Sequence, residues 1–234
     1  MNKTTIIMPV HNSGENLKPA VESILRSTAY FDSFLLIDDG STDGSEKLVD
    51  FFANNYKNVH ALHLPVREKP KEYDGRLIKV INVGIKFAKD SDIYITHDDV
   101  IHFKLYKADW LFGMKELAEN EDCGLVTSIN GGGVSDQTYL NNFNWIGTWS
   151  MYIPKRTIKK IGLFDENFIV GDDIDYTYRV VKEGLKCYLC DFWVDHHRQT
   201  NHQYSDKKSK MEKCVAYGKL ADKSGKYFKE KHDK

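Results

Sequence analysis

The first hundred residues alternate between short apolar runs and stretches in which apolar residues recur at helical spacing. Residues 4–10 and 34–37 are apolar, β-branched runs typical of buried strands, although Pro9 is expected to break the first one. Between such runs, leucine, valine and isoleucine return every three or four residues, as on one face of a helix. The pattern predicts strands at 4–10, 34–37, 59–64 and 91–99, with helices at 15–28, 48–52 and 77–88 between them.

This alternation of strand and helix predicts a parallel sheet with right-handed crossovers, and hence an α/β fold. Polar pairs lie at the ends of three of the predicted strands. The carboxyl ends of parallel strands meet along one edge of such a sheet, which is where nucleotides bind. The pairs are His11-Asn12, Asp38-Asp39 and Asp98-Asp99.

Asp98 and Asp99 are adjacent carboxylates at the end of an apolar run. Two such charges repel each other unless a cation or hydrogen-bond donors hold them. The pair is therefore a candidate site for a cation or ligand. A simple strand-to-turn junction is an equal alternative for the pair alone, because Asp commonly ends strands.

The pattern is less regular from residue 100 onward. A loop at 130–135 is rich in glycine, and from residue 206 a helical tail contains ten lysines and five acids. The Tyr227-Phe228 pair is expected to dock this tail on the rest of the chain. The predicted helices are 110–117, 155–161 and 172–184, and the predicted strands are 123–129, 145–153 and 187–194.

Composition narrows the class of protein. The 234 residues are enough for one large domain or two small ones. The net charge of -1 argues against a dedicated nucleic-acid binder. No apolar run reaches the length of a membrane span, and the N-terminus has no signal-peptide pattern. We therefore expect a cytoplasmic protein.

A series of short motifs stands in order along the chain: Pro9-x-His11-Asn12, Asp38-Asp39-Gly40-Ser41, Asn82-x-Gly84, His97-Asp98-Asp99, Gly162-x-Phe164-Asp165-Glu166, Gly171-Asp172-Asp173-x-Asp175 and Arg179. Together they resemble the family 2 glycosyltransferases of the GT-A fold, from residue 4 to about residue 200. The resemblance implies a Rossmann-like, mostly parallel sheet flanked by helices in a single domain. It also implies an inverting transferase that uses a nucleotide-diphosphate sugar and a divalent metal, Mn²⁺ or Mg²⁺.

The resemblance divides this single domain, 1–234, into three parts. Residues 1–99 are expected to bind the nucleotide, residues 100–205 to bind the acceptor and carry the catalytic group, and residues 206–234 to form a basic C-terminal helix. A UDP-sugar is the favoured donor, ahead of a GDP- or dTDP-sugar, and the acceptor is a hydroxyl of a glycan or glycolipid. The tail is either a peripheral contact with an anionic membrane or a solvated helix.

A divalent ion held by carboxylates can offset the negative charge of a departing nucleoside diphosphate. Asp99 is the first choice of metal ligand, with Asp98 facing the ribose or sharing the ion. The family often has a third acid next, where this chain has Val100. By resemblance His196, or His197 in the next register, completes the site, and the alternative is a solvated loop pair. With one or two protein ligands, the ion is expected to be held mostly by phosphates and water.

The resemblance assigns Pro9, His11 and Asn12 to the nucleotide site. His11 would lie over the base, or would be an ordinary polar turn residue. Asp39 would accept a hydrogen bond from the base, and an Asp-Gly turn also explains its position. Arg76 would face the base or the phosphates, with a solvated surface arginine as the alternative.

Asp173 matches the catalytic acid of the family. An inverting transfer needs a base that takes the proton of the acceptor hydroxyl. At a helix N-terminus the Asp173 carboxylate is expected to stay ionised. Asp172 would contact the acceptor, and helix capping is the alternative for both acids. Asp175 and Arg179 form a structural i,i+4 pair, and Trp149 would stack on a sugar or pack in the core.

Two other classes of function stay open. A nucleotidyltransferase shares this type of sheet, but it would need a glycine-rich, basic loop after the first strand, and Pro9-Val10-His11-Asn12 is neither. A nucleotide-sugar-binding module without activity would show Mn²⁺-dependent stabilisation by UDP and no transfer.

Overall fold

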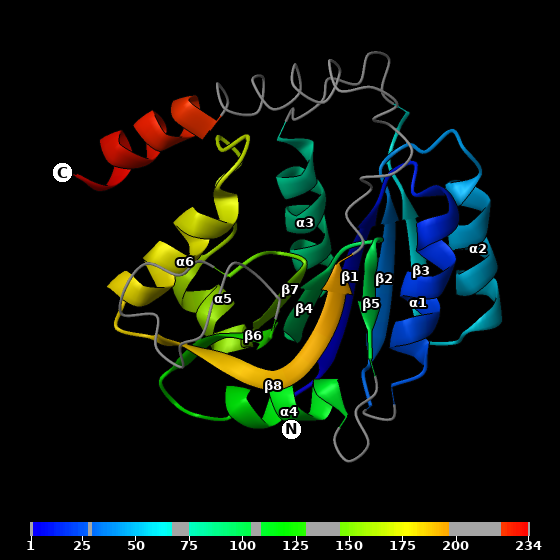
Figure 1. The fold of residues 1–234 in the computed structure, drawn as a ribbon, viewed down its shortest axis with the longest axis horizontal. Coiled ribbons are helices and arrows are strands. Elements are labelled where there is room, and N and C mark those ends of the chain that lie inside the picture. The colour runs from blue at the N-terminus through cyan, green and yellow to red at the C-terminus, as the bar shows by residue number, and fades with distance from the viewer. Residues whose placement is uncertain are drawn as a thin grey trace.

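A curled eight-stranded sheet lies between two layers of helices in the computed structural model of the protein (Figure 1). The strand order is β3-β2-β1-β4-β7-β6-β8-β5. The structure describes residues 2–27, 30–66, 75–103, 109–129, 146–196 and 221–233. In chain order the elements are β1 (Thr4–Val10), η1 (Gly14–Asn16), α1 (Leu17–Leu25), β2 (Ser33–Asp38), α2 (Ser45–Asn55), β3 (Val59–His63), α3 (Arg76–Phe87), β4 (Asp92–Thr96), β5 (Val100–His102), α4 (Trp110–Ala118), β6 (Cys123–Ile129), β7 (Ser150–Ile153), α5 (Lys155–Ile161), α6 (Asp172–Lys182) and β8 (Lys186–His196).

The first four strands form the parallel half of the sheet. β1 pairs with β2 on one side and β4 on the other, and β3 flanks β2. The helices α1, α2 and α3 connect these strands, which confirms the α/β alternation predicted from the sequence. Every residue of β1 is buried, as expected for a strand that is covered by helices on both faces.

The second half of the sheet mixes strand directions. β7 is antiparallel to both β4 and β6, whereas β8 is parallel to β6. β8 is the long curved strand in the lower half of Figure 1, and its far end pairs with β5 in antiparallel fashion. This pairing sets Val100 opposite His196. The segment that follows β4 therefore lies beside the end of the last strand.

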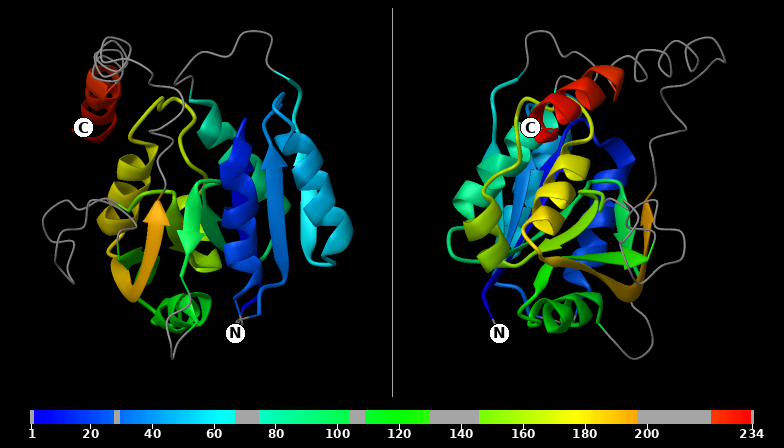
Figure 2. Two further views of the ribbon diagram at one scale, coloured as in Figure 1. Left: turned by 45° about the vertical axis from the view of Figure 1, so that its right-hand side comes forward. Right: turned by 90° about the vertical axis from the view of Figure 1, so that its left-hand side faces the viewer.

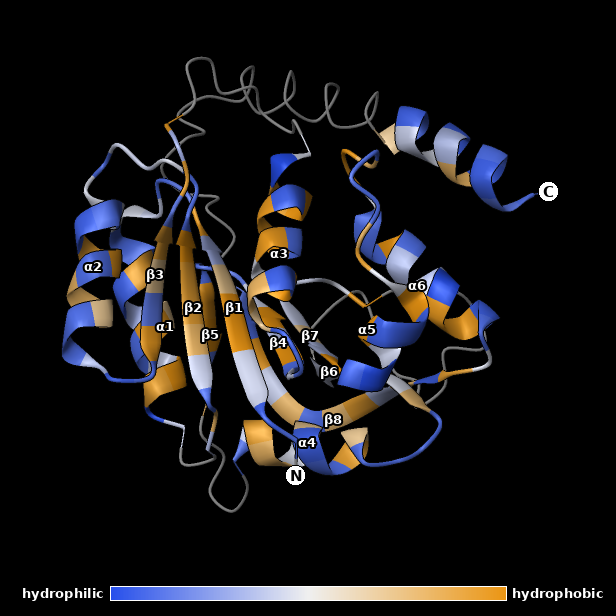
Figure 3. Cartoon of the chain, turned by 180° about the vertical axis from the view of Figure 1, so that it is seen from behind, coloured by the Kyte–Doolittle hydropathy of each residue, from blue (hydrophilic) through white to orange (hydrophobic). Residues whose placement is uncertain are grey.

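Two apolar layers hold the helices on the sheet. Figure 2 shows the helices and the sheet from two further directions. Met8 belongs to the layer that includes α1, α2 and α4, whereas Ile7 belongs to the layer that includes α3 and α6. Neighbouring residues of a strand point to opposite faces, so β1 contributes to both layers. The colouring of Figure 3 shows the apolar central strands and the mixed polar and apolar surfaces of the helices.

Two sequence predictions about strands are wrong in detail. Pro9 does not break β1, which continues to Val10. β4 pairs only as far as Ile7, so the proline ring lies beyond that ladder. The strand predicted at 145–153 begins only at Ser150, after a turn in which the Ser150 N–H donates to the Gly147 carbonyl at 3.2 Å. The predicted loop at 130–135 lies outside the described residues.

Residues 221–232 form a helix that lies near the start of α6 (Figure 1). The rings of Tyr227 and Phe168 meet edge to face, and so do those of Phe228 and Tyr178. The docking role expected for Tyr227-Phe228 is therefore confirmed. The rest of the tail, residues 206–220, lies outside the described residues. A membrane span would need a helix of about 20 apolar residues, and the described segments contain none.

Two basic side chains of this C-terminal helix point toward acids of the domain, a half-buried one and a fully buried one. Lys231 Nζ lies 2.8 Å from Asp165 Oδ2 and 2.7 Å from Asp175 Oδ1. His232 Nε2 lies 2.8 Å from the same Asp175 oxygen. Asp175 is fully buried, so its charge needs partners. Part of the basic charge of the tail is therefore paired with acids of the folded domain.

Candidate active site

His11 connects the carboxyl ends of β2 and β4. Its backbone N–H donates to Asp98 Oδ2 at 3.3 Å, and its ring Nδ1 lies 3.0 Å from the Asp39 carbonyl oxygen. The parallel ladders bring these strand ends to one edge. Three residues assigned to the nucleotide site by sequence therefore meet in space.

Asn12 and Pro9 have structural positions around this contact. Asn12 adopts a left-handed backbone with φ of 49°. Its N–H donates to Ser41 Oγ at 3.0 Å and its Oδ1 accepts from the Thr42 N–H at 2.8 Å. Pro9 pairs with Ile37 inside the sheet. Asn12 therefore holds the turn after β1 against the turn after β2.

The turn after β2 positions Asp39. Arg76, the first residue of α3, donates from Nε to Asp39 Oδ1, and its Nη2 donates to the Pro65 carbonyl at 3.1 Å. Asp39 is 2 % exposed. Gly40 has φ of 72°, and a Cβ there would lie 2.6 Å from Val66 Cα. This position requires glycine, because a side chain would meet the backbone.

Asp98 is a buried carboxylate at the end of β4. It accepts hydrogen bonds from the His11 N–H and from the Ser13 hydroxyl. Burial raises the pKa of Asp98 to about 6, although these hydrogen bonds act in the opposite direction. Ser13 stands at the N-cap position of η1. The Ser13 side chain makes no cap hydrogen bond and turns to Asp98 instead.

His97, Asp99 and His196 form a cluster with the chemistry of a metal site. One ligand atom from each lies within 4.8 Å of the others. Asp99 Oδ1 is 3.3 Å from His196 Nε2, yet this buried oxygen has no hydrogen-bond partner. An orphaned buried carboxylate oxygen beside two imidazoles fits a divalent cation. The sequence predicted Asp99 and His196, and it missed His97, whose only signal is its place before the acidic pair.

The charges of this cluster favour binding of a cation. Burial lowers the pKa of His97 to about 4, so its imidazole is neutral near pH 7. Burial tends to raise the pKa of Asp99, but the nearby His196 and His97 rings outweigh it and hold this pKa below its usual range. A neutral imidazole and an ionised carboxylate are the forms that bind metals.

Two neighbours fix the orientation of the imidazoles. His97 Nε2 lies 3.1 Å from Thr148 Oγ1. The Trp149 ring lies over His196, with 5.1 Å between ring centroids and 30° between planes. The sequence assigned Trp149 to the acceptor site. The structure places its ring against His196, one of the three candidate metal ligands.

Asp172 and Asp173 begin α6. Asp173 Oδ1 accepts a hydrogen bond from the Ile174 N–H at 2.9 Å. Burial raises the pKa of Asp173 to about 6. Burial and the adjacent Asp173 carboxylate raise the pKa of Asp172 well above its usual value. The cost of burial therefore outweighs the effect of the helix N-terminus on this pKa, although the Asp173 carboxylate is still mostly ionised at pH 7.

The turn before α6 packs against the start of α3. A Cβ on Gly75 would lie 2.9 Å from the Phe168 carbonyl oxygen, so the two segments are in close contact next to Arg76. Figure 1 shows the first turns of α3 and α6 toward the end of the molecule where β1 and β2 finish. No hydrogen bond between described residues joins Asp173 to Asp39 or Asp99. The first turn of α6, which carries Asp173, therefore lies toward the same end of the molecule as the strand ends that carry Asp39 and Asp99, without direct contact between them.

Asp175 and Arg179 have the structural role predicted for them. Arg179 Nε donates to Asp175 Oδ2 at 2.8 Å. Its other nitrogens donate to the carbonyls of Ile161 and Leu163. This arginine therefore ties α6 to the end of α5.

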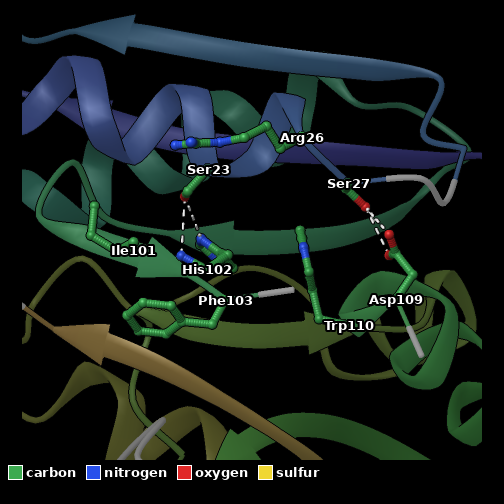
Figure 4. Close-up of a pocket in the computed structure, with 8 residues that line it drawn as sticks. All are labelled: Ser23, Arg26, Ser27, Ile101, His102, Phe103, Asp109 and Trp110. Carbon is green, nitrogen blue, oxygen red and sulfur yellow. Dashed lines mark hydrogen bonds between the residues drawn. The ribbon is translucent and has the colours of Figure 1, made fainter. Parts of the chain in front are cut away.

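A pocket of about 270 Å³ lies elsewhere, between α1, β5 and the start of α4 (Figure 4). The Trp110 and His102 rings face it, together with Ser27. None of the residues assigned to the nucleotide, the metal or the acceptor lines it. The candidate nucleotide and metal residues lie at the ends of the strands instead.

A model of the family described as glycosyl transferase family 2 matches residues 5–175. The chain belongs to glycosyl transferase family 2. This membership confirms the resemblance seen in the motifs.

This family 2 chain is similar to an uncharacterized glycosyltransferase, YibD, of Escherichia coli (strain K12), with 36 % identity over 123 residues. That match covers 52 % of this chain and 33 % of YibD. The chain spans about a third of the length of several curated relatives that it matches.

Solved structures confirm the GT-A fold. The mannosyltransferase PcManGT from Pyrobaculum calidifontis, in complex with GDP-Man and Mn²⁺, has a TM-score of 0.65 and 14 % identity, over 86 % of this chain and 59 % of that one. GalNAc-T7 with UDP, GalNAc and Mn²⁺ has a TM-score of 0.65 and 15 % identity, over 81 % of this chain and 42 % of that one.

Proposed function

We propose that this chain transfers a sugar from a nucleotide-diphosphate sugar to a hydroxyl of a glycan or glycolipid, with inversion at the anomeric carbon. The observation that carries the proposal is the meeting of His11, Asp39 and Asp98 at one sheet edge. An open α/β sheet binds nucleotides at such an edge.

A UDP-sugar is the proposed donor. Asp39 and Arg76 present a carboxylate and a guanidinium side by side, which suit the N–H groups of a base and the oxygens of a phosphate. Among the structural neighbours, GalNAc-T7 was solved with UDP and PcManGT with GDP-Man. A GDP-sugar is therefore the second choice.

The candidate metal site would hold one Mn²⁺ or Mg²⁺ ion. Asp99 and His196 would hold the ion, which supplies positive charge to the diphosphate as it leaves. Both named neighbours were solved with Mn²⁺. Asp98, held by His11 and Ser13, would face the ribose from the adjacent position.

Asp173 is the proposed general base. It takes the proton of the acceptor hydroxyl while that oxygen forms a bond to the anomeric carbon from the side opposite the diphosphate. The bond from that carbon to the diphosphate oxygen breaks, and the diphosphate leaves with the electron pair. A pKa of about 6 keeps Asp173 mostly ionised at pH 7 and basic enough to accept the proton. Asp172 would contact the acceptor.

Membrane contact by the tail gains no support from the described helix. Its outward side carries three exposed lysines and three exposed acids, so their charges balance. These residues are Lys223, Lys226, Lys229, Asp222, Glu230 and Asp233. A contact with an anionic membrane would have to come from residues 206–220.

The test compares donor turnover by the parent chain with that of Asp173→Asn, across a panel of UDP- and GDP-sugars and sugar acceptors with Mn²⁺. Loss of a positioned base lowers the rate by about 10²–10⁴-fold. Glu183→Gln, an exposed change at the other end of α6, is the matched control. Binding of UDP by the parent chain without transfer to any acceptor would instead favour a binding module.

A further inference from the structure

We infer that Tyr227 and Lys231 of the C-terminal helix, residues 221–232, are positioning residues for Asp173, and that they act by holding the turn before α6 against the first turn of that helix. The inference rests on the proposed function, because it concerns the surroundings of the proposed general base. It gives a role in the reaction to a segment that contributes no residue to the proposed donor or metal sites.

The C-terminal helix turns one face toward the rest of the chain. The side chains of this face are buried or half-buried and recur at helical spacing, whereas most of their neighbours are exposed. Aromatic contacts fix the orientation of the helix, because the Tyr227 ring meets Phe168 and the Phe228 ring meets Tyr178, both edge to face. The face consists of Ser224, Tyr227, Phe228, Lys231 and His232.

Lys231 joins two acids that lie ten residues apart in the chain. Its Nζ lies 2.8 Å from Asp165 Oδ2 and 2.7 Å from Asp175 Oδ1. Asp165 precedes α6, whereas Asp175 belongs to the first turn of that helix. Asp172 and Asp173 lie between these two acids and begin α6. One ammonium group therefore closes the segment that carries the proposed base.

The turn before α6 is held from two sides. On one side the Tyr227 hydroxyl donates to Asp165 Oδ2 at 2.9 Å, and the Tyr227 ring packs on Phe168. On the other side Asn82 of α3 donates to the Phe164 carbonyl at 2.9 Å and accepts from the Phe164 N–H at 3.0 Å. Loss of the contacts to the C-terminal helix should therefore loosen the start of α6 and leave the sheet folded.

The charges around Asp175 require the cation of the C-terminal helix. Asp175 is fully buried, and a buried carboxylate is costly without partners. Arg179 lies 2.8 Å from its Oδ2, whereas Lys231 and His232 both contact its Oδ1. Without Lys231, this oxygen would keep only an imidazole, and more negative charge would remain uncompensated near Asp173.

This uncompensated charge should change the protonation of Asp173. A carboxylate takes up a proton more readily when a nearby cation is lost, so Lys231→Met should raise the pKa of Asp173 above its value of about 6. A base that is protonated at pH 7 accepts no proton from the acceptor. The described charged or titratable groups of the preceding turn, of the first two turns of α6, of the start of α3 and of the facing C-terminal helix are Asp165, Glu166, Asp172, Asp175, Arg179, Arg76, Lys231 and His232.

The first experiment measures the pKa of Asp173 in the full chain without substrate, by carbon-13 NMR of labelled aspartate carboxyl groups. The Asp173 signal is identified by its absence in Asp173→Asn. We expect an upward shift of about half a pH unit or more in Lys231→Met. Lys231→Arg should restore the parent value, because it keeps a cation there. Lys229→Met, on the exposed side of the same helix, should cause no shift.

The second experiment measures transfer kinetics and UDP affinity at pH 7. We expect kcat to fall about tenfold in Lys231→Met and UDP affinity to stay unchanged, because Asp39 and Arg76 keep their contact. Tyr227→Phe keeps the ring and every charge and removes only the hydroxyl bond to Asp165. We expect it to lower kcat less than Lys231→Met does. Circular dichroism checks the folding of each variant.

Two results would overturn the inference. One is an unchanged pKa of Asp173 in Lys231→Met, and the other is a kcat equal to that of Lys229→Met in both Lys231→Met and Tyr227→Phe. The two proposals fail separately. A parent chain that transfers no sugar removes the proposed function, and the NMR titration still decides whether the C-terminal helix acts on Asp173. Transfer by the parent chain without a response to these changes removes the inference alone.

Discussion

Arg76 Nε donates to Asp39 Oδ1, and this contact joins the first turn of α3 to the end of β2. We expect Arg76→Met to lower the free energy of unfolding by about 1–3 kcal/mol, because it removes a charged donor from a buried carboxylate. Urea denaturation at pH 7 measures the change. The double variant Asp39→Asn, Arg76→Met should recover part of the loss, and simple additivity of the two single changes would contradict coupling.

The same pair should affect nucleotide binding. We expect Asp39→Asn and Arg76→Met each to weaken UDP affinity at least tenfold, as calorimetry would measure. Lys79→Met, an exposed change on α3, serves as the control. Unchanged UDP affinity in both variants would separate this pair from the donor site.

The pH dependence of transfer should report Asp173. Its pKa is raised to about 6 by burial, and a base acts only when it is ionised. We expect kcat/KM to fall about tenfold per pH unit below pH 6 and to level off above it. A midpoint near the usual pKa of Asp, or the same profile in Asp173→Asn, would argue against this assignment.

Asp172 should make stability depend on pH. Burial and Asp173 raise its pKa in the folded chain above the value in the unfolded chain. The folded state therefore holds a proton that the unfolded state releases, and this contribution to stability is lost as pH rises through the folded pKa. We expect Asp172→Asn to stabilise the chain by about 1–3 kcal/mol at pH 8 and little at pH 4. Denaturation at both pH values tests the sign.

Lys231 should hold the C-terminal helix in place. It contacts Asp165 and the fully buried Asp175, so Lys231→Met leaves both carboxylates with one donor fewer. We expect a loss of about 1–3 kcal/mol in unfolding free energy. Lys229→Met, on the exposed side of the same helix, should change stability by less than about 0.5 kcal/mol. Equal effects of the two changes would show that the contact contributes nothing specific.

The parallel half of the sheet was predictable because its signals are local. Buried parallel strands are continuous apolar runs, such as the one ending at Asp98, and the helices between them show their period directly. The proximity of the acidic pairs at the ends of these strands then follows from the topology alone. The predicted helix at 15–28 was less accurate, because η1 replaces its first turn and α1 ends at Leu25.

The rest depends on contacts between distant residues. β5 has three residues and forms by pairing with β8. No local sequence pattern therefore predicts it. The last strand was expected to end at residue 194 and continues to His196 for the same reason. His97 becomes a candidate ligand, and Trp149 a neighbour of His196, only when β8 is in place. The raised pKa of Asp173 likewise reflects burial, which no motif reveals.

The pairing of β5 with β8 determines when the proposed cation site can form during synthesis. During synthesis His97 and Asp99 emerge about a hundred residues before His196. A nascent chain that has completed β4 can form the parallel half of the sheet from neighbouring segments, yet it offers an ion only two of the three ligands. Metal capture would then mark the moment when the last strand docks, and a half-made chain would carry the acidic pair without the cation.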